Sequence, residues 1–110
     1  MFQEVTLVDC RPGEASLHVV RARPAGRPYV WRSETEPGTF GFFLLFEGED
    51  GKWFVQEINF FSTYNSVFAI YFQFLSFEDL KLTFPKEVRY ITGDNAQATF
   101  FPEPLPADRA

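Results

Sequence analysis

The residues that most often build metal centres and covalent catalytic sites are almost missing from this chain of 110 residues, which contains one cysteine, Cys10, and one histidine, His18. A single cysteine cannot form an intrachain disulfide or a cysteine cluster for zinc, and a single histidine excludes a site with two histidine ligands. Cys10 is followed by Arg-Pro-Gly, so no helix begins there to activate its thiol, and a nucleophile–base pair of Cys10 with His18 is disfavoured. We therefore expect no metal site and no cofactor, and a binding protein is favoured over an enzyme.

Long apolar runs are also missing. The longest extends from residue 67 to residue 77 and is interrupted by Gln73 and Ser76, which leaves it short of the roughly 20 residues that a membrane-spanning helix needs. The first residues, Met-Phe-Gln-Glu-Val, contain no basic segment of the kind that begins a signal peptide. These features predict a cytoplasmic protein without a membrane partner.

Basic residues are outnumbered by acidic ones, and the formal net charge is −5. Residues 1–32 carry five arginines against three acidic residues, whereas residues 33–110 carry five basic residues against twelve acidic ones. An acidic protein gains little from phosphate contacts, so nucleic acid is disfavoured as a partner. The basic segment is a candidate to bind an acidic or phosphorylated partner, because it interleaves Arg21, Arg23, Arg27 and Arg32 with Tyr29 and Trp31. Pairing of these arginines with acidic residues of the same chain is the simpler alternative.

What the chain has in excess is aromatic residues: fifteen phenylalanines, four tyrosines and two tryptophans. Many of them lie in residues 39–61, on either side of the dipeptide Asp50-Gly51. Asp-Gly between two apolar segments is typical of a β-hairpin with a two-residue turn. In that register, Leu44 would lie opposite Glu57.

Both faces of this hairpin would be largely apolar, because side chains alternate along each strand. One face would carry Phe43, Leu45, Phe54, Ile58 and Phe60, and the other would carry Phe40, Phe42, Leu44, Phe46, Trp53, Val55 and Phe61 with Glu57 and Asn59 among them. Antiparallel sheets usually have one polar face, so we expect the second face to be covered by another sheet, a helix, a ligand or another chain. Glu57 is expected at the solvated rim of the sheet, since a buried carboxylate would need a partner.

Other alternating segments predict short strands at residues 2–9, 15–22, 29–32, 67–75, 80–84, 88–91 and 97–101. The pattern predicts an all-β domain over residues 1–101, a β-sandwich or small barrel of about eight short antiparallel strands. Residues 67–75 also fit a helical stripe, so an α+β fold with residues 65–76 helical is the alternative. Ser76 begins a pattern typical of a helix cap, which allows one helical turn there. Residues 102–110 contain three prolines and predict an extended tail.

These features favour a non-catalytic interaction domain that binds another protein or self-associates through an aromatic sheet face. The candidate partner-binding residues are Phe42, Trp53, Glu57, Asn59 and Tyr71, together with Arg21, Arg23, Tyr29 and Trp31. An alternative is a small barrel or sandwich that binds an apolar or carbohydrate-like ligand on a platform of Trp53, Tyr71, Glu57, Asn59 and Gln73. The third hypothesis is an acid–base enzyme that uses Glu57. It is disfavoured because no second carboxylate shares the apolar surroundings of Glu57.

Overall fold

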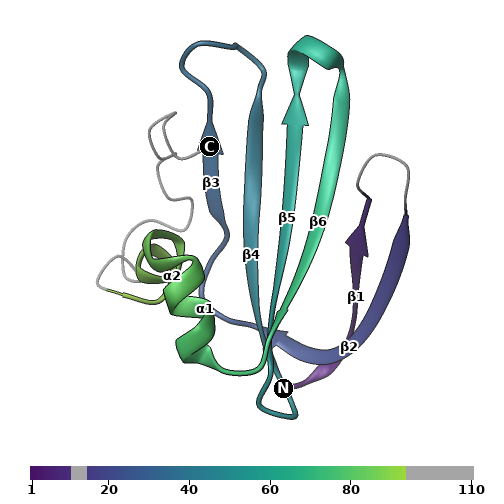
Figure 1. Ribbon diagram of the computed structural model, residues 1–110, viewed down its shortest axis with the longest axis vertical. Helices are drawn as coiled ribbons and strands as arrows, with labels where there is room; N and C mark the ends of the chain where they lie inside the picture. The colour runs from purple at the N-terminus through teal and green to yellow at the C-terminus, as the bar shows by residue number, and fades with distance from the viewer. Residues whose placement is uncertain (11–14, 94–110) are drawn as a thin grey trace.

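The chain is described by a computed structural model that covers residues 1–10 and 15–93. This part of the chain is mostly β: one antiparallel sheet of six strands is followed by two short helices (Figure 1). The strands are β1 (Gln3–Asp9), β2 (Ser16–Pro24), β3 (Tyr29–Arg32), β4 (Phe40–Gly48), β5 (Trp53–Phe61) and β6 (Ser66–Phe74). A 3-10 turn, η1 (Ser62–Tyr64), joins β5 to β6, and the helices are α1 (Phe77–Thr83) and α2 (Pro85–Thr92). The β-rich fold predicted from the sequence is confirmed.

The strand predicted over residues 67–75 is confirmed as β6, so the alternative with residues 65–76 helical is wrong. The strands predicted at residues 80–84 and 88–91 are also wrong, because these residues belong largely to α1 and α2. The strand predicted at residues 97–101 and the tail at 102–110 lie outside the described residues.

The start of α1 explains why the alternation of residues 80–84 was misleading. Ser76 caps the helix, with its Oγ accepting a hydrogen bond from the backbone N–H of Asp79 at 3.2 Å. Such a cap supplies an acceptor for one of the N–H groups that the first helical turn leaves unpaired. Leu80 is then fully buried while Leu82 is 80% exposed, so these two leucines do not share a face as they would in a strand.

The strands of the sheet follow the order β1-β2-β4-β5-β6, and β3 also pairs with β4. Strands β2 and β3 share one edge of β4: β2 pairs with its last residues, and β3 pairs with residues 40–43. The sheet curls, so that its first strand returns to its last (Figure 1). The backbone N–H of Cys10 donates to the carbonyl oxygen of Ala69 in β6 at 2.6 Å.

The side chain of Gln56 in β5 connects β1 to the sheet at a point where β1 and β6 form no ladder of backbone hydrogen bonds. Its side-chain Oε1 accepts from the N–H of Val8 at 2.7 Å, and its Nε2 donates to the carbonyl of Val8 at 2.8 Å. The same Nε2 lies 3.0 Å from the carbonyl oxygen of Ile70. A primary amide offers one acceptor and two donors, so this buried side chain takes the place of a peptide group of a neighbouring strand.

The predicted hairpin exists, but its predicted register is wrong by one residue. Gly48 donates to the carbonyl of Lys52 at 2.7 Å, and Gly51 donates to the carbonyl of Gly48 at 3.1 Å. The loop therefore has three residues, with Gly51 at φ +90° in the left-handed region, as in hairpins that close with a glycine bulge. Leu44 consequently lies opposite Gln56, and Phe43 lies opposite Glu57.

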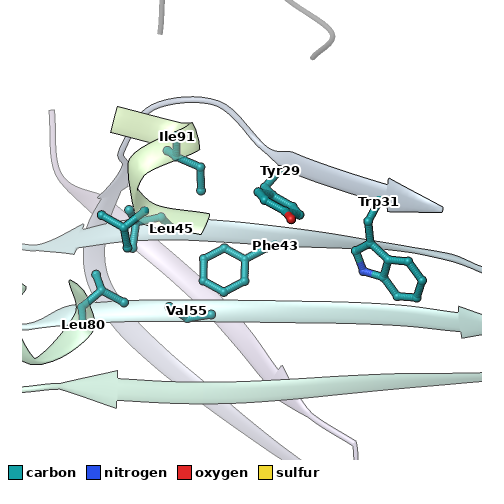
Figure 2. Close-up of a cluster of buried hydrophobic side chains, with 8 residues drawn as sticks. Tyr29, Trp31, Phe43, Leu45, Val55, Leu80 and Ile91 are labelled. Carbon is teal, nitrogen blue, oxygen red and sulfur yellow. The ribbon is translucent and has the colours of Figure 1, made fainter. Parts of the chain in front are cut away.

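Two clusters of buried side chains lie on opposite faces of the central strands. Both helices pack on one face, where Leu80, Val88 and Ile91 join Tyr29, Trp31, Phe43, Leu45 and Val55 in one buried cluster (Figure 2). We call this the helix-covered face. The hairpin β1–β2 closes over part of the other face, around Leu7, Ala22 and Phe54.

Candidate functional site

One part of the second face is covered by neither of these clusters. Directly opposed residues of an antiparallel pair point to the same side of the sheet, so the register defines two rows of side chains across β3, β4, β5 and β6. We call these rows the open aromatic face: Arg32, Phe40, Phe60 and Val67 in the first row, and Val30, Phe42, Ile58 and Ala69 in the second.

Three phenylalanines form the centre of the open aromatic face. The ring of Phe40 lies 5.7 Å from that of Phe42 and 5.6 Å from that of Phe60, measured between centroids, with interplanar angles of 86° and 42°. Aromatic rings at these separations attract one another in tilted and edge-to-face arrangements. The mutual contacts hold the rings in place and leave them partly exposed.

Solvent reaches this face in the described part of the chain. Phe40 is 37% exposed and Val67 is 53% exposed, while Phe42, Ile58 and Phe60 are half-buried. The described helices lie on the opposite side, and β1 with β2 packs over the end of the sheet nearer to the β4–β5 turn. An apolar side chain left in water forgoes about 25 cal/mol for each Å² that a partner could cover. Contiguous exposed patches of this kind usually mark an interaction site.

A hollow of about 460 Å³ borders the face at its β3 edge. It is lined by Val30, Trp31, Arg32, Ser33, Pro37, Gly38, Thr39 and Phe40. The loop between β3 and β4 is ordered by its own hydrogen bonds: Ser33 Oγ accepts from the N–H groups of Thr35 and Glu36, at 3.2 and 2.9 Å. The hollow therefore has a preformed wall on its loop side.

Arg32 is the single cation among the side chains of the open aromatic face. It is exposed, and it forms no ion pair with another described residue. The other arginines proposed as partner-binding residues differ in this respect. Arg21 pairs with Glu49 at 2.9 Å, and Arg23 pairs with Glu47 at 3.0 Å, which is the simpler alternative considered for them.

The register separates the residues that the sequence suggested as one surface. Phe42 lies on the open aromatic face, whereas Trp53, Glu57 and Asn59 lie on the helix-covered face. Trp53 packs on the ring of Phe77 in α1, at 4.6 Å between centroids. The aromatic surface predicted around Trp53 and Phe42 is therefore not a single surface.

The carbohydrate platform is likewise not assembled. Tyr71 lies opposite Gln56 and Gln73 lies opposite Phe54, so both point away from the face that carries Trp53. Tyr71 instead stacks on His18, with the rings 4.0 Å apart and nearly parallel at 6°. The lone histidine is thus a packed residue in a stack between β2 and β6.

Tyr29 and Trp31 are buried, at 0% and 2% exposure, on the side of the sheet that carries the helices (Figure 2). They belong to the core of the helix-covered face and not to a surface shared with Arg21 and Arg23. Glu57, expected at a solvated rim, is 9% exposed, so that expectation is wrong. Its position opposite Phe43 and Ile70 explains the burial.

Residues of the open aromatic face that the sequence analysis did not name as binding residues include Phe60, Val67 and Val30, whereas Arg32 belongs to the basic segment that it did name. The signal that could have found them is the hairpin register, because it decides which residues of β5 share a face with Phe40 and Phe42. Within residues 1–10 and 15–93, no group of three or more metal-ligating side chains comes together. The described helices include none long and apolar enough to cross a membrane.

Comparisons of the chain with protein-family models, with curated proteins and with solved structures found no match.

Proposed function

We propose that this protein is a non-catalytic interaction domain that binds another protein chain through the open aromatic face. The observation that carries the proposal is the cluster of Phe40, Phe42 and Phe60, held on one side of the sheet with Phe40 37% exposed. Preformed aromatic anchors lose little side-chain entropy when a partner covers them, and aromatic residues contribute strongly at interface centres. The rigid sheet beneath them keeps the anchors in position.

We also propose that the curled sheet is a small, partly open barrel and not a sandwich. Two contacts support this form: Cys10 of the returning chain bonds to Ala69 in β6, and the side chain of Gln56 bonds to Val8 in β1. In such a barrel the first and second rows lie toward the end at which β4 pairs with β3 and not with β2. The open aromatic face is then the mouth region of the barrel.

The test compares the protein with the double variant Phe40→Ser/Phe60→Ser and with the control variant Leu75→Ser/Leu82→Ser. The control removes two exposed leucines, 73% and 80% exposed, that lie outside the open aromatic face. Light scattering of the purified protein detects self-association, and co-purification with quantitative mass spectrometry detects other partners. The complexes should be lost in the phenylalanine variant and kept in the control.

Complexes that persist in a folded Phe40→Ser/Phe60→Ser variant contradict the proposal. If that variant unfolds, the phenylalanines are needed for the core, and Val67→Glu replaces it. Val67 is 53% exposed in the same row, so a charge there should block a partner while the fold persists, as circular dichroism would show.

A further inference from the structure

Among the described strands, β3 pairs only with β4, so its outer edge directs backbone groups away from the sheet beside the open aromatic face. Ser33 N–H donates to the carbonyl of Thr39 at 2.8 Å, which makes these two residues a hydrogen-bonded pair of the β3–β4 ladder. Hydrogen-bonded and non-hydrogen-bonded pairs alternate in an antiparallel ladder. Tyr29 and Trp31 therefore direct their backbone groups toward β4, while Val30 and Arg32 direct theirs outward.

The side chains of these same two residues belong to the open aromatic face. Val30 is opposite Phe42 and Arg32 is opposite Phe40, and both line the hollow of about 460 Å³. A strand added outside β3 would therefore place alternate side chains in line with the two rows. The side chain next to Val30 would extend an apolar row, and the side chain next to Arg32 would meet an exposed guanidinium.

We infer that β3 is a docking edge for an extended, acidic segment of a partner protein, which adds a strand to the sheet. The segment carries an apolar residue and an Asp or Glu two positions apart, both directed to the open aromatic face. The apolar side chain enters the hollow beside Phe40, and the carboxylate pairs with Arg32. This inference rests on the proposed function, because it names the kind of partner that the same face takes.

Three observations converge on this type of partner. The outward N–H and C=O groups of Val30 and Arg32 supply main-chain affinity, and the hollow supplies a pocket for one side chain, as in other cases of strand addition. Arg32 supplies local charge complementarity, because it is exposed and forms no ion pair with a described residue. The edge is only four residues long, so it suits a short segment and not a long strand.

The experiment measures fluorescence anisotropy of a fluorescein-labelled heptapeptide with the full-length protein. The probe has phenylalanine and glutamate two positions apart and threonine elsewhere, and a second probe replaces the glutamate by lysine. Two further probes carry N-methyl groups on one or the other alternate set of backbone amides. Because only one set faces the sheet in an added strand, one N-methylated probe should bind and the other should not.

The protein variants separate main-chain from side-chain recognition. Val30→Pro removes an outward N–H and leaves the ladder with β4 intact, a place where edge strands tolerate proline; it should weaken binding of the glutamate probe at least about tenfold. The matched variant Val30→Thr keeps the N–H and a β-branched side chain, so it should lose much less affinity than Val30→Pro, and an equal loss would overturn recognition through the main chain. Arg32→Glu should weaken the glutamate probe about tenfold and prefer the lysine probe, since like charges repel at an interface.

Equal binding of both N-methylated probes, or unchanged binding by Arg32→Glu, overturns the inference. Absence of glutamate-probe binding up to about millimolar peptide, the weak end of measurable affinity, also overturns it. If the probe fails while Phe40→Ser/Phe60→Ser still abolishes complexes, strand addition is wrong and the proposed function stands. If both experiments fail, both proposals are wrong.

Discussion

Replacing Gln56 by leucine tests how the curled sheet is held closed. The side chain is 4% exposed and makes hydrogen bonds of 2.7 and 2.8 Å to Val8 and of 3.0 Å to Ile70. Leucine has a similar size but leaves one N–H and two carbonyls without this partner. Each stranded group costs about 1–3 kcal/mol when it stays buried. Val8 is half-buried and water can reach part of it, so the low end applies, and we expect a loss of about 3 kcal/mol in the free energy of unfolding.

The assay is urea unfolding followed by tryptophan fluorescence, with Gln73→Leu as the matched control. Gln73 is exposed and accepts one hydrogen bond from Tyr71 at 3.0 Å, so its loss should change stability by no more than about 0.5 kcal/mol. In a domain of this size, the loss at Gln56 corresponds to a melting temperature lower by roughly 10–20 °C. A Gln56→Leu variant within about 1 kcal/mol of the wild type would refute the reasoning, because a buried amide that replaces a peptide group cannot be removed without cost.

Two further variants test the packing on either face of the sheet. Burial raises the pKa of Tyr71 above its usual 10.0. A raised folded-state pKa means that stability is fully present below the unfolded value and falls as the pH rises through the folded one. Melting temperatures above pH 10.0 should therefore fall more steeply for the wild type than for Tyr71→Phe, and parallel curves would contradict this. On the helix-covered face, a Cβ added at Gly41 would lie only 2.4 Å from Asn59 Oδ1 and from Trp31 Nε1, so the side chains must shift. Gly41→Ala should destabilise the fold by about 1–3 kcal/mol in urea unfolding, and an unchanged midpoint would show that the contact relaxes freely.

The hairpin shows how far local sequence carries a prediction. Its position follows from Asp50-Gly51 between apolar runs, because Gly51 accepts the positive φ that the turn requires. The same dipeptide fits a two-residue loop and the three-residue loop that forms, and local propensity does not choose between them. The choice shifts β5 by one residue against β4, which exchanges the faces of Trp53 and Phe54. Most of the candidate surface was misplaced by that one step.

Contacts between residues far apart in the sequence account for the other features of the fold that the sequence did not predict. The bonds from Gln56 to Val8 span 48 residues, and no alternation within either strand signals them. For the helices a local signal was present: Ser76 followed by Asp79 predicted a cap, and the cap is there. The apolar residues after it satisfied helical and alternating patterns together, so tertiary packing against the sheet decided between the two.

The most direct measurement of the central claim is site-specific photo-crosslinking from the open aromatic face. A photo-reactive phenylalanine analogue replaces Phe40 in one preparation and Leu82, 80% exposed on α1, in another. Irradiation in cells should give a discrete protein adduct from position 40 and none from position 82, since only the former lies in the proposed interface. Equal adduct formation at both positions, or none at position 40, would contradict the claim that this face binds a partner chain.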